Sequence, residues 1–303
     1  MIINFSEAEE HIRQLLKVGT TFTYNSSPYQ VIVCDKPTCP KGEPKTDVYV
    51  LAVNTLNNTN MEFKISYKKS NADFLENKIR ADRAAEILGS DWSEIIQNSI
   101  STIKDKFLAK PLIYKSKYKR TEAGAITLGW KFELLNKKSG ELSGELKLTQ
   151  HQLSDVYAGT NLSKDKRNAL INNNIVQDSG VANFILFSKT DTYSSTQDVI
   201  NDLVDIDQYI NNHPKIYFAC KALNYRSLVN KYDGDRPLAV YVNWEVINNK
   251  LSGTLCFDTP LQQGGNAVNH RLHIALDKIN ATNTIQLNSN NVHNPEIIYG
   301  NEQ

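Results

Sequence analysis

Apolar and polar residues alternate with two different periods along the first third of the chain. Residues 5–17 carry apolar side chains three and four positions apart, which predicts an amphipathic helix. Residues 29–34, 47–53 and 61–67 are short runs rich in β-branched and aromatic residues, and each predicts a strand. The turn residues 54–60 join the last two runs, so we expect these two strands to form a hairpin.

The rest of the chain continues this mixture of helical and strand patterns. We expect helices at 71–88, 94–107, 198–209 and 270–279. We expect a second hairpin, formed by 126–135 and 141–149, and further strands at 183–188, 216–223, 238–246 and 251–257. No internal repeat or long linker interrupts the pattern. The sequence therefore predicts a mixed α/β fold in a single domain over 1–303, with core elements in 5–110 and the remaining strands and elaborations in 111–303.

Composition and charge exclude several classes of protein. The 303 residues include 34 Lys and Arg against 33 Asp and Glu, a net charge of +1, which excludes a histone-like or acidic-tail protein. Four cysteines are too few for a disulfide scaffold, and no second Cys or His pair at zinc-finger spacing accompanies the first two. No secretory signal or run of 18 apolar residues is present, so we expect a cytoplasmic protein with no membrane partner.

Candidate chemistry lies on the first hairpin. Alternate residues of a strand share a face, so Glu62 and Lys64 point the same way while Phe63 packs into the opposite face. Asp47 opens the neighbouring strand, and we expect its carboxylate to approach that of Glu62. Converging carboxylates suit Mg²⁺, which prefers oxygen ligands. The other three Glu-x-Lys occurrences lie in a proline-rich loop, on a helix, or on a strand without a nearby preceding Asp.

This order of elements, with Asp47 followed by Glu62-Phe63-Lys64, resembles the PD-(D/E)XK nuclease superfamily, which includes type II restriction endonucleases. The resemblance covers residues 5–90 and implies a restriction-endonuclease-like core, a central mixed sheet flanked by helices, with a strand-rich C-terminal half. It implies that Asp47 and Glu62 hold Mg²⁺, with Phe63 included in the metal-binding set, and that Lys64 assists the attacking water. Thr46 stands where the family pattern has proline.

Three further residues near this motif are candidates. Glu9, on the first helix, has two readings: a catalytic carboxylate near the metal, as in many superfamily members, or the capping-box partner of Ser6. Ser66 and Lys68 continue the face of Glu62 and Lys64, towards a position where a DNA backbone can lie.

A basic stretch provides additional candidate DNA contacts. Residues 101–120 carry a net charge of +6, and two tyrosines interleave with the lysines. Clustered Lys with aromatic residues is typical of phosphate-backbone contact, and a solvated charged loop is the alternative. The DNA-binding candidates here are Lys115, Lys117, Lys119 and Arg120.

These observations favour a Mg²⁺-dependent endonuclease acting on double-stranded DNA, as the resemblance implies, and most specifically a type II restriction endonuclease. Such enzymes usually act as homodimers, so that one active site serves each strand. A cognate DNA methyltransferase is a possible companion. Two alternatives stay open: a phage or repair nuclease of the same fold, acting on branched or damaged DNA, and a non-catalytic DNA-binding or interaction protein in which the triad is accidental.

Overall fold

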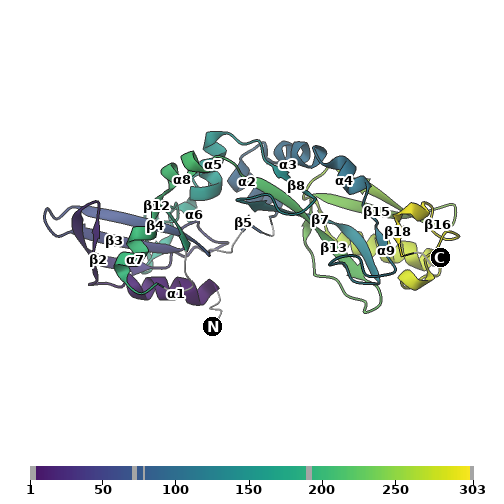
Figure 1. The fold of residues 1–303 in the computed structure, drawn as a ribbon, viewed down its shortest axis with the longest axis horizontal. Helices are drawn as coiled ribbons and strands as arrows, with labels where there is room; N and C mark the ends of the chain where they lie inside the picture. The colour runs from purple at the N-terminus through teal and green to yellow at the C-terminus, as the bar shows by residue number, and fades with distance from the viewer. Residues whose placement is uncertain (1–4, 70–73, 78, 189–192, 301–303) are drawn as a thin grey trace. The chain divides into compact units, whose positions relative to one another are not determined.

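The computed structural model describes residues 5–69, 74–77, 79–188 and 193–300. Contacts divide the chain into two compact units (Figure 1), each built from separated segments. The first unit comprises Met1–Asp73, Glu86–Gly89 and Leu148–Pro214. The second comprises Phe74–Ala85, Ser90–Lys147 and Lys215–Gln303. Both units include segments on either side of residue 110, because residues 65–69 pair with residues 184–188 in the first unit and residues 74–76 pair with residues 134–135 in the second.

The first unit is built on a six-stranded sheet. In spatial order its strands are β1 (Thr21–Tyr24), β2 (Ser27–Asp35), β3 (Val48–Asn54), β4 (Asn60–Lys69), β11 (Phe184–Ser188) and β12 (Val204–Asp205). Neighbours within this sheet are antiparallel, except that β4 and β11 run parallel. The predicted hairpin of β3 and β4 is confirmed, and the sheet is mixed, as expected.

Two helices cover one face of this sheet, α1 (Phe5–Leu15) and α7 (Thr196–Asp202), as Figure 1 shows. Alternate residues of β3 and β4 supply the core on this face, because the side-chain period of a strand is two. Phe63 lies at its centre, with ring contacts to Phe22 and Phe184 at centroid separations of 5.4 and 5.3 Å. Ile12 and Leu16 reach this cluster from the α1 segment. Burial of these apolar groups is the main force that holds α1 against the sheet.

The opposite face is covered by α5 (Gln150–Ala158) and α8 (Ile206–Asn212). A capping box between Thr149 and Gln152 starts α5. The ring of Tyr209 packs against Tyr157 of α5 and stacks on Phe187 of β11. These contacts hold α5 and α8 over β11. Between α5 and β11 the chain makes an excursion that contains α6 (Lys164–Arg167), β9 (Leu170–Ile171) and β10 (Asn174–Ile175).

The second unit is built on an eight-stranded sheet. Its main path is β16 (Lys250–Cys256), β15 (Val240–Ile247), β7 (Ala125–Leu135), β13 (Tyr217–Arg226) and β8 (Ser143–Glu145). The strands beside this path are β5 (Phe74–Glu76), β6 (Ile113–Tyr114) and β18 (Ile298–Tyr299). A small separate ladder pairs β14 (Pro237–Leu238) with β17 (Gln263–Gly264).

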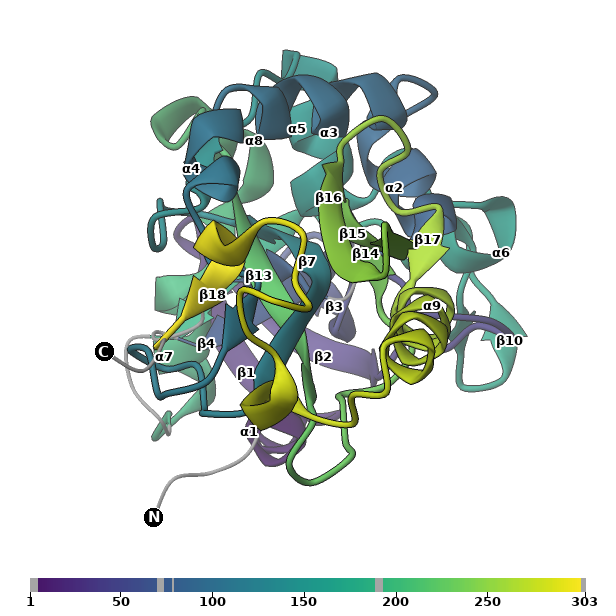
Figure 2. The ribbon, with the colours of Figure 1, turned by 90° about the vertical axis from the view of Figure 1, so that its right-hand side faces the viewer.

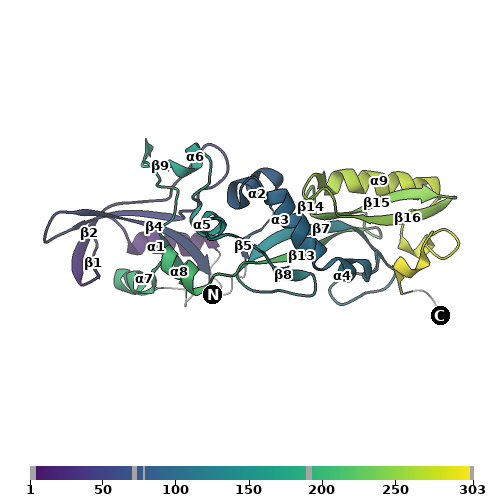
Figure 3. The same cartoon turned by 90° about the horizontal axis from the view of Figure 1, so that it is seen from above.

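Helices pack around this second sheet. They are α2 (Ala81–Leu88), whose last turn belongs to the first unit, α3 (Trp92–Ser101), α4 (Lys104–Leu108) and α9 (Gly265–Lys278). Two short 3-10 turns follow, Thr284–Gln286 and Pro295–Ile297. Figure 2 faces this unit, and Figure 3 shows α9 lying along β15. No helix among the described residues is long and apolar enough to cross a membrane.

Several predicted elements are corrected. Of the helix expected at 71–88, residues 74–76 form β5 and only residues 81–88 are helical, while residues 71–73 and 78 lie outside the described residues. The helix expected at 94–107 is divided into α3 and α4, and the helix expected at 198–209 is divided by β12. The second hairpin is wrong, because β13 pairs with both β7 and β8 and lies between them. The first strand, β1, was not predicted.

Candidate active site

Asp47 lies at the start of β3, where two hydrogen bonds fix it beside β4. Its backbone N–H donates to the carbonyl of Ile65 at 2.8 Å. Its carboxylate Oδ2 accepts from the backbone N–H of Tyr67 at 2.7 Å. The carboxylate thus takes the place of a strand carbonyl as the acceptor for the Tyr67 N–H, which fixes it beside Tyr67 of β4.

The register of the hairpin separates Asp47 from Glu62. Leu51 is the residue of β3 that pairs with Glu62, and it lies four residues after Asp47. At about 3.3 Å per strand residue, this offset corresponds to about 13 Å along the strands. The expected approach of the two carboxylates is therefore wrong. The physical reason is that Asp47 opens one arm of the hairpin, so its neighbours are near the end of the other arm.

Glu62 and Lys64 form a local group of their own. The predicted shared face is confirmed, because Lys64 Nζ lies 3.7 Å from Glu62 Oε2. The phenol of Tyr49 donates to Glu62 Oε1 at 2.5 Å, and burial together with this carboxylate raises the pKa of Tyr49. Phe63 has no exposed surface and lies in the apolar core, so its side chain is not a metal ligand.

Glu9 is the carboxylate that comes close to Asp47. The two residues line one cavity of about 330 Å³, together with parts of the loop 36–44. Glu9 is 4% exposed, and its Oε2 accepts from Lys36 Nζ at 2.7 Å. Burial raises the pKa of Glu9 and the nearby Asp47 charge adds to this, while Lys36 opposes it. These contacts place the Glu9 carboxylate in the cavity beside Asp47, where a catalytic carboxylate was expected.

Lys68 and Ser66 lie beside Asp47 as well. Lys68 Nζ is 3.9 Å from Asp47 Oδ2. Ser66 is 1% exposed, and its Oγ has no hydrogen-bond partner in the described part of the chain. The same holds for the hydroxyl of Thr46, which lines the cavity. Of these two orphaned hydroxyls, that of Thr46 belongs to the cavity wall, and each has the capacity to bind a further group.

Three lysines surround the two carboxylates. Burial raises the pKa of Asp47, and the charge of Lys68, the Tyr67 N–H, and the charges of Lys45 and Lys36 oppose that shift. Lys45 itself is only 6% exposed. The sequence analysis did not identify Lys36 or Lys45. The sequence indicates Lys36 and Lys45 only by their position in or next to the proline-rich loop 36–44, which precedes Asp47.

The donor set at this site suits a hard cation. Among the residues that the structure describes, no group of three or more His, Cys, Asp and Glu side chains is placed to hold a metal ion. Mg²⁺ nevertheless binds commonly through one or two carboxylates, with waters and substrate phosphates completing its octahedron. Glu9, Asp47 and the orphaned Thr46 hydroxyl line the cavity and are oxygen donors of this kind.

The predicted basic DNA-binding stretch lies in the second unit, after β6. Lys117, Lys119 and Arg120 are exposed and Lys115 is half-buried. Glu141 pairs with Lys119, at 2.7 Å, and also with Lys110, so part of the positive charge is balanced. The interleaved Tyr114 and Tyr118 pack with Tyr299 in one ring cluster. The tyrosines therefore have a structural role as well.

Comparisons of the chain with protein-family models, with curated proteins and with solved structures found no match. A functional assignment therefore depends on the geometry of the site itself.

Proposed function

We propose that the first unit is the catalytic part of a divalent-metal-dependent endonuclease that acts on double-stranded DNA. One observation carries this proposal: Glu9 and Asp47 share a cavity, with Lys68 3.9 Å from Asp47. Two carboxylates and a lysine are the groups that metal-assisted phosphodiester hydrolysis needs.

The arrangement of elements supports the same reading. Helix α1 is followed by the antiparallel strands β2, β3 and β4, and β11 then joins the sheet parallel to β4. The PD-(D/E)XK resemblance rested on the order helix, three strands, helix and a later strand. Here β1 precedes β2, and β5 and the shorter helix α2 follow β4. In this proposal the motif lies four residues further along β4, so that it consists of Asp47 and Ser66-Tyr67-Lys68. The departure is that Ser66 stands where the family has its second carboxylate.

In this proposal each side chain has a distinct role. Glu9 and Asp47 hold the metal, which when bound polarises the phosphodiester and lowers the pKa of water. The hydroxyls of Ser66 and Thr46 hold waters at the edge of the site. Lys68 orients the attacking water and stabilises negative charge on the phosphate oxygens. Lys36 neutralises Glu9 until substrate and metal bind.

A type II restriction endonuclease is the specific form we propose, with a homodimer cutting the two strands and a companion methyltransferase protecting host DNA. Cytoplasmic location is part of this proposal. A phage or repair nuclease has the same catalytic requirements and differs in the DNA that it cuts.

The decisive experiment incubates the purified full chain with plasmid and phage DNA, in Mg²⁺ and in EDTA. Discrete Mg²⁺-dependent fragments are expected for a restriction enzyme, and preferential cutting of branched or damaged duplexes would instead support the repair alternative. Cleavage should be lost in Asp47→Asn and kept in the matched control Glu62→Gln. Absence of cleavage on every DNA with every divalent metal would refute the catalytic proposal.

A further inference from the structure

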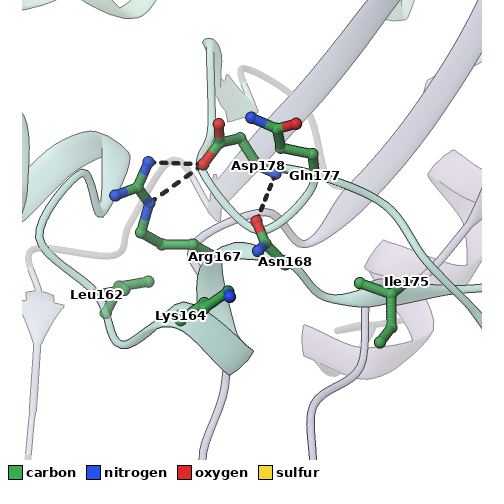
Figure 4. A pocket seen from close by; sticks show the side chains of 7 residues that line it. All are labelled: Leu162, Lys164, Arg167, Asn168, Ile175, Gln177 and Asp178. Carbon is green, nitrogen blue, oxygen red and sulfur yellow. Dashed lines mark hydrogen bonds and ion pairs between the residues drawn. The ribbon is translucent and has the colours of Figure 1, made fainter.

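A second cavity in the first unit, of about 550 Å³, lies in the excursion between α5 and β11 (Figure 4). Lys164, Asn168 and Gln177 supply polar groups to it, and Leu162 and Ile175 supply apolar ones. Ile175 is 74% exposed, so its apolar surface is accessible to a ligand. The cavity thus combines a cation, two amides and exposed apolar surface.

The wall of this cavity is fixed by internal bonds, as the dashed lines in Figure 4 show. Arg167 binds Asp178 through two nitrogens, at 2.7 and 3.1 Å from the same carboxylate oxygen. The backbone N–H of Asp178 donates to Asn168 Oδ1 at 3.0 Å. A Cβ at Gly180 would lie 1.9 Å from the carbonyl oxygen of Lys166, so only glycine permits this close chain approach. The site is therefore formed before any ligand arrives.

Hydrogen-bonding capacity is left over on the polar groups. Within the residues that the structure covers, the side chains of Lys164 and Gln177 make no hydrogen bond or ion pair, and both residues are exposed. The Asn168 side chain accepts a hydrogen bond through its oxygen, so its amide N–H groups remain for a ligand. These donors and acceptors match the phosphates and base edges of DNA, since Asn and Gln pair well with adenine.

This excursion is tied directly to the residues before Asp47. The carbonyl of Gly180 accepts from the backbone N–H groups of Lys45 and Thr46, at 3.0 and 3.2 Å. With 3.8 Å between consecutive Cα atoms and about 5.5 Å across the bonded pair, Asp178 and Asp47 are within about 17 Å. At about 3.4 Å per base pair, that distance is about five base pairs.

We propose that this cavity contacts duplex DNA within a few base pairs of the cleaved phosphodiester. Lys164 binds a backbone phosphate, Gln177 and Asn168 contact a base edge, and Ile175 packs on sugar or base. The first unit then contributes to sequence discrimination as well as to catalysis. This inference rests on the proposed nuclease function, because it assigns part of the substrate contact to that same unit.

The test measures DNA binding without cleavage. The full chain carrying Asp47→Asn is titrated in EDTA against a fluorescein-labelled duplex pool with a random central segment, between about 50 and 200 mM salt. Adding Lys164→Ala should weaken binding several-fold and reduce the slope of log affinity against log salt by about 0.9. Lys17→Ala, at an exposed lysine after α1, is the matched control and should change neither.

A selection from the same pool separates phosphate contact from base contact. Gln177→Ala should relax the preference at one base position while leaving the salt slope unchanged, because an amide carries no charge. Binding by Lys164→Ala that is identical to that of Lys17→Ala, with circular dichroism confirming folded protein, would overturn the cavity assignment. That result would leave the nuclease proposal intact, since cleavage by the unmodified chain is measured separately.

Discussion

The two ends of the β3–β4 hairpin present similar charges in different surroundings. At one end Asp47 lies 3.9 Å from Lys68 and lines a cavity together with the buried Glu9 and the unpartnered hydroxyl of Thr46. At the other end Glu62 and Lys64 lie 3.7 Å apart, and the phenol of Tyr49 donates a hydrogen bond to the Glu62 carboxylate, which is partly exposed to solvent. Both ends offer a carboxylate and a lysine, so motif letters alone do not distinguish them.

The difference lies in convergence and burial. Glu9 arrives from a helix and Asp47 from a strand, so their carboxylates meet from separate elements on one cavity. Glu62 and Lys64 both lie on β4, and Tyr49 of the neighbouring strand donates a hydrogen bond to Glu62. Catalytic sites concentrate strained electrostatics of the first kind, since burying like charges together costs free energy that packing elsewhere must offset.

The largest expected effect is a difference in DNA cleavage between variants of Asp47 and of Glu62. Asp47→Asn should reduce cleavage by about 1000-fold or more, because loss of metal-mediated charge stabilisation is worth several kcal/mol. Glu62→Gln should cleave within a few-fold of the unmodified chain. Single-turnover cleavage of plasmid in Mg²⁺ measures both. Equal losses of activity in the two variants would show that Glu62 acts together with Asp47, against the hairpin register described above.

The two lysines provide the next comparison. Lys68→Met should lower the single-turnover rate by about 100-fold, in the range expected when a group that assists proton transfer is removed. Lys64→Met should leave the rate nearly unchanged, because Lys64 contacts Glu62 and not Asp47. Affinity for DNA in EDTA serves as a control, since a purely phosphate-binding Lys68 would lose affinity rather than rate.

Lys36→Met tests the internal counter-ion of Glu9. Without Lys36 the buried Glu9 carboxylate loses its ion-pair partner, so thermal stability in EDTA should fall by about 1 kcal/mol, a discounted value because Lys36 is 45% exposed. Added Mg²⁺ should raise the Tm more in this variant than in the unmodified chain, because the metal replaces the missing cation. Identical Mg²⁺ shifts in the two proteins would contradict metal binding at Glu9.

The smallest effect concerns pH. The pKa of Glu9 is raised in the folded chain, so the unfolded chain ionises first and folding stability falls as pH rises from about 4.5 through the folded pKa. Glu9→Gln removes this loss. In metal-free buffer its stability relative to the unmodified chain should improve as pH rises over that window, as denaturant melts at several pH values will measure. A stability difference between the two proteins that stays constant over this pH range would show that Glu9 does not have a raised pKa in the folded chain.

Much of the first unit could be predicted from the sequence, because its signals are local. The helical period of α1, the apolar run of β3 and the alternation in β4 predicted the correct elements, and Phe63 faces the core as expected. Longer helical patterns failed where tertiary pairing intervened. Phe74–Glu76 reads as helix in isolation, yet pairing with β7 makes it a strand. The expected second hairpin failed for a similar reason, since β13 pairs with both of its arms.

The candidate site shows the same division between local and non-local information. The sequence by itself determined that Asp47 heads a strand, that Ser66 and Lys68 share a face with Lys64, and that Glu9 lies on a preceding helix. Only the tertiary structure decided which of these meet. Register places Lys68 rather than Glu62 beside Asp47, and the packing of α1 brings in Glu9. The physical reason is that strand register and helix docking are set by the burial of many apolar contacts at once, which no short motif encodes.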